Sequence, residues 1–580
     1  MTPWWQKQSE EARLRLARHD ALLHLAVLAV IAGVLSGLVI IAFRLLVEEL
    51  AAFWSPSGSE EDFEAVSLQY RLVLPLLGAV LLAILYVRFG KGVRVLGVAR
   101  VIERMNYHQG HHSLRGFLMQ FFGATIAIVS GHSVGREGPH VFLGAAASSL
   151  FGQKLRLPNN SIRTLVACGT AAGIAASFNT PLAGVIFALE VVVMEYTIAS
   201  FIPVVLAAAS ATLVSIAAFG NAPAFTIQPL SLTSLTDVPM VILLGLIAGA
   251  LATLMILLVK LVAGRAKRLE MWQRMLIAGF VMLPFAWLLP QTMGVGYDTV
   301  NQLFGGETLL QLALLLVLGK LLATSAVIGL GIPGGIIGPS LFIGAALGAA
   351  CEALAVSAGM DVVPGFLPLL GMGAMMGATL QAPLAALTAM MELTHAPGII
   401  MPGMLAIVIA SMTASEVFGQ ESIFITMMKA AGLDIDQNPV RQALRRLGVV
   451  SAMSTDFSRT RQQIKVGEAQ QLLQDKPVWL LVEKDDGSAV LLRAVDLAGV
   501  IGEKEEANSD PVEEATIDLL DIPGQRFDAT AVSSRATLQE ALEKLDTQVA
   551  EALYVESDSV TGVPRIYGIL TRDMIESAYR

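Results

Sequence analysis

Long apolar stretches separated by short polar segments occupy the first 430 residues of the chain. Some are long enough to span a hydrocarbon core of about 30 Å, and they lie at 21–43, 70–87, 236–262, 274–290, 308–328 and 398–418. Shorter pieces interrupted by Gly and Pro lie at 117–130, 139–152, 163–177, 181–195, 338–356, 364–377 and 383–394. Irregular backbone at membrane depth is tolerated only inside protein or beside a wet cavity. The pattern therefore predicts an all-α polytopic membrane protein whose broken helices surround an internal polar site.

The pattern changes after residue 438, where helix-period and strand-period segments alternate over 450–501 and again from 522 to the end. This change predicts a pair of small α/β modules outside the membrane. We therefore divide the chain into a polar N-terminal segment (1–20), a membrane domain (21–430) and a soluble C-terminal pair of modules (438–580).

Composition and charge agree with this division. Of the 580 residues, 54% are hydrophobic and 15% charged, whereas soluble domains have about 25% charged residues. Basic residues precede the first span and gather again at 260–274, which predicts that both regions, and both termini, are cytoplasmic. The two cysteines, Cys168 and Cys351, are too few for a disulfide framework or a cysteine-rich metal site. We expect no metal, no cofactor and no nucleic-acid partner.

Two short elements of the membrane domain occur twice. The letters TPLAG at 180–184, which precede Glu190, reappear as APLAA at 382–386 before Glu392, an offset of 202 residues (392 − 190). The letters GPxxF at 138–142 reappear at 338–342, an offset of 200 residues (338 − 138). The repeat predicts duplicated halves, for which an inverted arrangement is the expectation, with a binding site where the halves meet.

The segment Gly135-Arg136-Glu137-Gly138 places a carboxylate among glycines at the start of an apolar helix. An ionisable residue inside a membrane domain is a functional hypothesis by default. The glycines allow backbone N–H groups to approach a ligand, and the helix N-terminus favours negative charge, so this segment predicts an anion site. Glu137 would compete for the same place when ionised and leave it when protonated. The alternative is that Glu137 is simply paired with Arg136.

The second half carries a similar device at 334–339, in which Gly335, Ile336, Ile337 and Gly338 precede another apolar helix. Two facing helix N-termini would share one anion. The alternative is that these glycines only allow tight helix packing.

The motifs GREGP at 135–139 and GGIIGP at 334–339, together with the doubled PLA elements, resemble the CLC family of chloride channels and chloride–proton exchangers. The resemblance covers residues 20–430. It implies a homodimer in the lipid of a bacterial inner membrane, with one pathway per subunit for chloride or a similar small anion. It also implies that Glu137 is the extracellular gate.

The chain departs from the family pattern at other pathway positions. The anion-coordinating serine of the family falls on Leu96, beside Gly97 and Val98. The phenylalanine of its GxFxP motif becomes Ile337, and its inner-gate tyrosine falls on Phe424. Backbone amides around Leu96 and Gly97 are expected to remain available to an anion. These changes leave open whether the anion is chloride, nitrate, bicarbonate or fluoride.

A further departure concerns protons. The inner proton-transfer glutamate of the exchangers in the family falls on Val191, which follows Glu190. Because an aliphatic side chain cannot carry a proton, passive conduction is the leading hypothesis. Proton-coupled antiport is the alternative, with Glu195 or a water chain as the route for protons. We expect Glu190 and Glu392 to bond helix ends rather than to act in transport.

The C-terminal pair resembles tandem CBS modules, in which a hydroxyl and a carboxylate near the end often bind an adenine nucleotide. The matching residues are Thr571 and Asp573, but their spacing is one residue shorter than usual and the first module lacks the threonine. A structural, dimer-stabilising role is therefore the leading expectation, with nucleotide binding as the alternative.

Other function classes have weaker support. Residues 131–135 (GHSVG) match the nucleophile motif of α/β hydrolases, but they end an apolar segment instead of joining a strand to a helix. We therefore do not expect an enzyme. His108, His111 and His112 are interpreted as a solvated turn and not as a metal site. A nutrient cotransporter would need a further polar cluster for an organic substrate.

Overall fold

The computed structural model describes residues 14, 16, 22–55, 61–90, 97–195, 198–225, 227, 237–306, 308–360, 362–433, 439–484, 486–507, 516–548, 550–557 and 565–578. The chain forms two compact units. The helical unit comprises 25–155 and 162–435, and the second unit comprises 1–24, 156–161 and 436–580.

Helices make up the first unit. Those of the first half are α2 (Leu22–Ala51), α3 (Leu68–Phe89), α4 (Val98–Tyr107), α5 (Leu114–Val129), α6 (Glu137–Lys154), α7 (Asn159–Phe178), α8 (Pro181–Phe187), the π-helix η1 (Ala188–Val193) and α9 (Ile198–Phe219). Those of the second half are α10 (Val238–Ala266), α11 (Met271–Leu288), η3 (Pro290–Thr292), α12 (Tyr297–Leu303), α13 (Leu310–Leu330), α14 (Ile337–Ser357), α15 (Phe366–Leu380), α16 (Pro383–Thr394), η4 (Pro397–Ile399), α17 (Ile400–Met412), the π-helix η5 (Thr413–Val417) and α18 (Ile423–Ala430).

The polytopic character predicted from the apolar pattern is confirmed, since nine helices within the described residues are long and apolar enough to cross a membrane. One of them, α9, is missing from the predicted spans. Pro203 lies inside it, and a proline within an apolar run ordinarily marks a helix end. The pieces predicted at 163–177 and 338–356 are also longer than expected, because α7 and α14 run for 20 and 21 residues.

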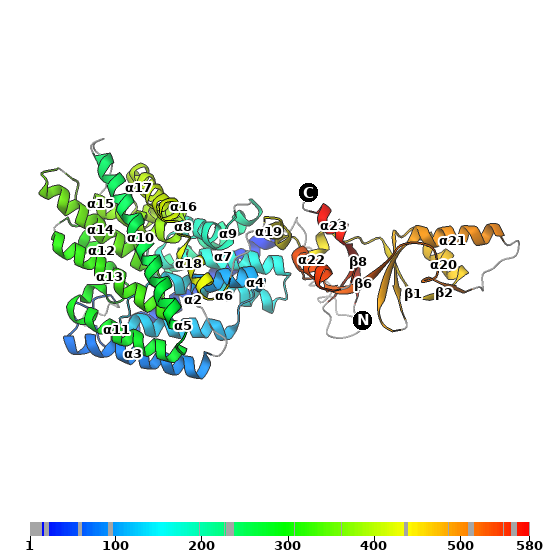
Figure 1. Cartoon of the computed structure of the whole chain (residues 1–580), viewed down its shortest axis with the longest axis horizontal. Helices are drawn as coiled ribbons and strands as arrows, with labels where there is room; N and C mark the ends of the chain where they lie inside the picture. The colour runs from blue at the N-terminus through cyan, green and yellow to red at the C-terminus, as the bar shows by residue number, and fades with distance from the viewer. Residues whose placement is uncertain are drawn as a thin grey trace. The chain divides into compact units, whose positions relative to one another are not determined.

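Equivalent helices of the two halves pack in the same way, which confirms the duplication. In the first half α6 meets α7 at Gly144 and Gly169, and in the second half α14 meets α15 at Gly344 and Gly371. A Cβ at any of these four positions would overlap a carbonyl oxygen of the facing helix. Such contact between backbones is how helices associate in lipid, where apolar surface alone supplies no driving force. In Figure 1, α3 and α11 lie side by side along one edge of this unit.

Two glutamates tie the halves to each other. The carboxylate of Glu392 on α16 accepts hydrogen bonds from the first N–H groups of α8, at 3.1 and 2.7 Å. The carboxylate of Glu190 on η1 accepts from the first N–H groups of α16, at 3.2 and 2.7 Å. The predicted role of both residues at helix ends is confirmed. Each half caps the other, and such reciprocal contacts are the mark of a local two-fold axis.

The second unit contains the predicted pair of α/β modules. Its helices are α19 (Pro439–Arg446), η6 (Val449–Ser451), α20 (Val466–Gln474), α21 (Ala494–Ala507), α22 (Leu538–Thr547) and α23 (Arg572–Ser577). Its strands are β1 (Phe457–Arg461), β2 (Gln463–Lys465), β3 (Trp479–Glu483), β4 (Ala489–Arg493), β5 (Thr516–Asp518), β6 (Arg526–Ser533), β7 (Ala552–Glu556) and β8 (Ile566–Thr571).

A six-stranded sheet in the order β1-β3-β4-β6-β7-β8 joins the two modules. In each module the first strand pairs in parallel with the second, which pairs antiparallel with the third. The antiparallel pair β4–β6 connects the modules. The same strand pairing therefore occurs in both modules, which agrees with the predicted pair of α/β modules.

Removing either capping carboxylate should destabilise the helical unit. In Glu392→Ala the N-terminus of α8 loses its acceptor, and in Glu190→Ala that of α16 does. Because loss of a helix cap costs about 0.5–2 kcal/mol, both variants should unfold at a lower temperature by similar amounts. Thermal unfolding of the purified protein measures this, with the exposed Glu416→Ala as control. Unchanged unfolding temperatures in both variants would contradict the capping role.

Candidate functional site

The two glycine segments of the repeat meet in the interior of the helical unit. Gly135 N–H donates to the carbonyl of Gly335, and Gly335 N–H donates to the carbonyl of Gly135, both at 2.7 Å. The two residues form an antiparallel bridge immediately before α6 and α14. The N-termini of two helices, one from each half, are thereby held next to each other.

Only glycine fits at this junction. A Cβ at Gly138 would lie 2.7 Å from the Gly335 Cα, and a Cβ at Gly335 would lie 2.6 Å from the Gly138 nitrogen. A Cβ at Gly135 would overlap the Glu137 carboxylate. The glycines therefore allow the two backbones to pack closely, as the alternative in the sequence analysis proposed. The same close packing brings the two helix N-termini together and so forms the site. Because the N–H groups of Gly135 and Gly335 bond to each other's carbonyls, they are not open to an anion in this structure.

The Glu137 side chain fills the space at the start of α14. Its carboxylate Oε2 accepts a hydrogen bond from Gly338 N–H at 3.0 Å, and its Oε1 accepts one from the hydroxyl of Tyr297. The residue is only 1% exposed. A negative group thus occupies the position that a helix N-terminus offers to an anion.

Arg136 has a different carboxylate partner from the one considered in the sequence. Its guanidinium pairs with Glu61 at 3.7 Å. The same guanidinium lies over the ring of Tyr297, 5.4 Å from the ring centroid. Glu137 is held by Gly338 and Tyr297, so a simple pairing with Arg136 does not account for its position.

Tyr297 was not predicted as a site residue. It is the first residue of α12 and follows Gly296, which has φ 85°, a conformation that glycine adopts without strain. Its ring is 3% exposed and packs against Phe178 and Phe225, at centroid distances of 5.8 and 5.2 Å. Its position after a glycine-rich turn in an apolar region was the available signal.

Lys320 was also missed, although it is the only charged residue of the predicted span 308–328. It is fully buried on α13, and its ammonium group donates to the carbonyls of Thr292, Gly294 and Val295, at 3.2, 2.8 and 3.0 Å. These carbonyls belong to the turn that leads into α12. Lys320 therefore fixes the turn that positions Tyr297.

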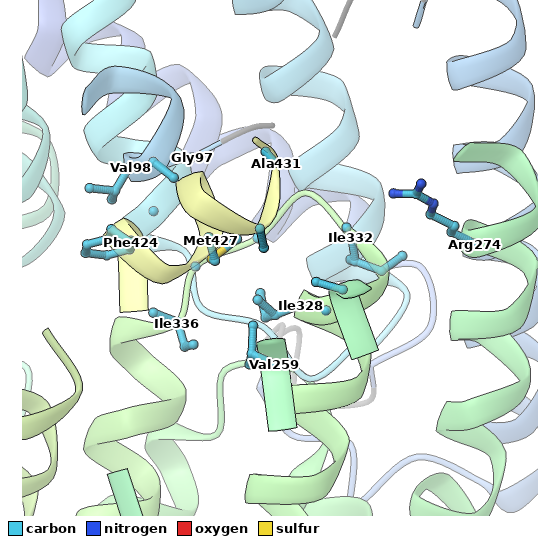
Figure 2. Close-up of a pocket in the computed structure, with 18 of the residues that line it drawn as sticks. Gly97, Val98, Val259, Arg274, Ile328, Ile332, Ile336, Phe424, Met427 and Ala431 are labelled. Carbon is cyan, nitrogen blue, oxygen red and sulfur yellow. The ribbon is translucent and has the colours of Figure 1, made fainter. Parts of the chain in front are cut away.

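A cavity of about 520 Å³ borders the glycine junction, where Gly138, Gly334 and Gly335 line it. Among the described residues, those predicted from sequence that line it are Gly97, Val98, Gly138, Gly335, Ile336, Ile337 and Phe424. Lys267 and Arg274 add positive charge to its wall, and Figure 2 shows Arg274 directed toward the cavity from α11. A cavity thus borders the junction, and the buried Glu137 carboxylate lies at the junction itself.

The backbone amides of Leu96 and Gly97 were expected to be available to an anion. Leu96 lies outside the described residues. The N–H of Gly97 donates to the Gln120 side-chain oxygen at 2.9 Å, so the prediction that this amide is open to an anion is wrong for this structure. Gln120 was not predicted as a site residue, and its side-chain oxygen accepts the hydrogen bond that a bound anion would otherwise accept.

Val191 is buried in η1, one residue after the capping Glu190. It is not among the described residues that line the large cavity. A small cavity of about 20 Å³ lies between Glu137 and Phe187 of α8, and its other lining residues are mostly apolar. This space therefore lies next to both Glu137 and α8, the helix that precedes η1 and Val191.

The remaining candidate residues lie elsewhere. Thr571 ends β8, and Asp573 lies in the first turn of α23. Ser133 of the hydrolase-like motif bonds to Thr324 at 2.9 Å, and its segment lies between two helices, without the strand that a nucleophile elbow requires. The interpretation of the three loop histidines as a solvated turn is wrong for His112, which is buried against the ring of Phe142.

Comparison with known proteins gives a consistent result. The family model described as voltage gated chloride channel matches residues 77–415. A ClcB-like chloride channel protein of Ralstonia nicotianae is 32% identical over 400 residues, which cover 66% of this chain and 91% of that protein.

Solved structures share the fold. A slow cyanobacterial Cl⁻/H⁺ antiporter is 22% identical with a TM-score of 0.61, covering 70% of this chain and 98% of that one. A eukaryotic CLC transporter is 19% identical with a TM-score of 0.59, covering 95% of this chain and 98% of that one. The second match includes the C-terminal pair of modules, so the similarity extends over both units.

Replacing Lys320 should destabilise the helical unit. Lys320→Met leaves three buried carbonyls without their donor, and hydrogen bonds to a charged group are the stronger kind, so we expect a loss of at least about 2 kcal/mol of unfolding free energy. Lys429→Met is the control, because Lys429 is exposed and forms a surface ion pair with Glu421, for which about 0–1 kcal/mol is expected. Equal unfolding temperatures of the two variants would argue against the role of Lys320 in fixing the turn before α12.

Proposed function

We propose that this chain, which belongs to the voltage-gated chloride channel (CLC) family, carries chloride or a similar small anion through a pathway that Glu137 gates. Anion transport is the general activity of the family, whose members are transporters and channels and not enzymes. This membership also removes the intramembrane hydrolase from consideration. The chain is a multi-pass membrane protein.

The observation that carries the proposal is the position of the Glu137 carboxylate. It accepts a hydrogen bond from the N–H of Gly338 at the N-terminus of α14. A helix N-terminus of this kind is a typical binding site for a small anion. A carboxylate and an anion cannot occupy that place together, because like charges repel strongly where water is excluded. Conduction therefore requires that Glu137 leave, and protonation or displacement by an anion accomplishes this.

The large cavity supports the same function on the other side of the junction. Lys267 and Arg274 lie in its wall, and positive charge at a cavity mouth raises the local concentration of anions. Farther in, the lining by Ile336, Ile337 and Phe424 is apolar. An anion there would be held by the positive field of helix N-termini more than by side-chain hydroxyl groups.

Passive conduction is the mode that the residues favour. Val191 is aliphatic and buried, so it offers no proton carrier at the position where exchangers of the family are expected to have one. Proton-coupled antiport is the second candidate, and the fold shared with a Cl⁻/H⁺ antiporter supports it.

We also propose the setting in which the protein works. The chain would form a homodimer in the bacterial inner membrane, with both termini in the cytoplasm. The C-terminal pair would stabilise that dimer and would need no adenine nucleotide. The exposed apolar side chains of α9, α16 and α17 are compatible with either lipid or a second subunit.

Joint measurement of chloride and proton movement tests the mode of transport. The purified protein is placed in liposomes with a chloride gradient, and the membrane potential is set by potassium and valinomycin. We expect chloride flux without uphill proton movement, because residue 191 cannot transfer a proton. Uphill proton movement driven by the chloride gradient would contradict passive conduction and establish antiport.

The Glu137→Gln variant tests the gate. A neutral side chain is not held in the anion site by charge, so chloride flux should be larger than in the unmodified protein and independent of pH. The matched control is Glu61→Gln, because Glu61 pairs with Arg136 near the gate without touching the anion position. A Glu137→Gln protein whose flux and pH response are unchanged would remove Glu137 as the gate.

A further inference from the structure

Two donors from different elements hold the carboxylate of Glu137. One is the N–H of Gly338 at the start of α14, and the other is the hydroxyl of Tyr297 at the start of α12. The two bonds go to different oxygens of the carboxylate. The backbone donor belongs to the anion site itself, whereas the tyrosine approaches the gate from a separate helix.

We propose that Tyr297 is a positioning residue that holds the gate glutamate in its closed place and sets the pH at which the gate opens. This inference rests on the proposed role of Glu137 as the gate. It adds a second residue to the gate, one that neither the motifs of the sequence nor the lining of the large cavity includes.

Contacts on several sides hold the Tyr297 side chain in place. Its ring is packed by Phe178 and Phe225 and covered by the guanidinium of Arg136. The turn before it is fixed through its carbonyls by the buried ammonium of Lys320. A donor that is already oriented loses little conformational entropy when it forms its bond, so such a bond is stronger than one from a mobile side chain.

The hydroxyl and the carboxylate can both lie against the start of α14 because residue 338 is glycine. A Cβ there would lie 3.0 and 3.1 Å from the two carboxylate oxygens and 3.1 Å from the Tyr297 hydroxyl oxygen. These distances are shorter than ordinary van der Waals contact. The hydroxyl, the carboxylate and the Gly338 backbone thus form one compact cluster.

The hydroxyl favours the ionised, closed gate over the protonated, open one. A neutral donor bonds more strongly to a carboxylate than to a carboxylic acid. Without the hydroxyl the closed form loses this bond, so the gate opens at a higher pH. Hydrogen bonds to charged groups are strong enough to shift the midpoint by about 1–2 pH units.

Several other charged or titratable groups lie on the elements around this cluster, and a change of Tyr297 to Phe alters none of them. Arg136 lies over the ring of Tyr297 and pairs with Glu61. The others in the surrounding elements are His140 on α6, Lys320 on α13, Asp298 on α12, and Asp62 and Glu64 in the segment before α3. A shift in the Tyr297→Phe variant therefore reports the hydroxyl and not a change in the surrounding charge.

Tyr297→Phe tests the proposal, because it keeps the ring and removes the hydroxyl. Chloride flux from liposomes is measured across a range of pH for the unmodified protein, Tyr297→Phe, Glu137→Gln and the double variant. The control is Tyr70→Phe, whose side chain is exposed on α3. We expect the midpoint of activation in Tyr297→Phe to move by about 1–2 pH units to higher pH, with the maximal flux at low pH retained.

The outcomes separate this inference from the proposed gate. If Glu137→Gln abolishes the pH response and Tyr297→Phe leaves the midpoint unchanged, Glu137 remains the gate and the role of Tyr297 is overturned. If the flux of the Glu137→Gln variant still depends on pH, the proposed role of Glu137 as the gate is overturned. The double variant should behave as Glu137→Gln does, and an added effect of Tyr297→Phe in that background would overturn the positioning role.

A second variant covers the case in which Tyr297→Phe does not fold. Gly338→Ala places a methyl group in close contact with both the hydroxyl and the carboxylate, so that one of them must shift, while keeping Tyr297 itself. It should move the midpoint in the same direction as Tyr297→Phe. An unchanged midpoint in a folded Gly338→Ala protein would count against the proposal.

Discussion

The pairing of Gly135 with Gly335 is the constraint on which the rest of the helical unit depends. Two backbone hydrogen bonds of 2.7 Å join turns that lie 200 residues apart (335 − 135), and they bring the N-termini of α6 and α14 together. A Cβ at Gly335 would overlap the backbone nitrogen of Gly138, and a Cβ at Gly135 would overlap the Glu137 carboxylate. The repeat in the sequence follows from this, because both halves must supply the same glycine turn to build one bridge.

The site around this bridge is assembled in layers. Lys320 fixes the turn before α12, that turn orients Tyr297, and Tyr297 together with Gly338 N–H holds the Glu137 carboxylate. Each layer places a charge or dipole before any ion arrives. Sites prepared in this way act strongly where water is excluded, because no reorganisation is needed when the ion binds. The wall of the large cavity is mostly apolar. An anion in that cavity would therefore be attracted mainly by the positive ends of the helices and by Lys267 and Arg274.

The sequence was sufficient for the elements that carry a local signal. Apolar length predicted most spans, the repeat predicted the duplicated halves, and the glycines around Glu137 predicted a carboxylate at a helix N-terminus. It did not identify Tyr297, whose partner lies 160 residues away, or the amide of Gln120 that satisfies Gly97. Lys320 differs from these, because a lone charge in an apolar span was visible in the sequence and only its partners were hidden.

The contrast between passive conduction and antiport reduces to how a proton would reach Glu137 from the side of Val191. The space beside the gate holds about 20 Å³, room for one water. Among the described residues that line it, Glu137 alone is ionisable, and its wall is otherwise formed by apolar side chains and Thr180. A proton entering there must therefore travel on water and not along fixed side chains. Antiport therefore requires that this space be wetted, in addition to the movement of the carboxylate that either mode of transport requires.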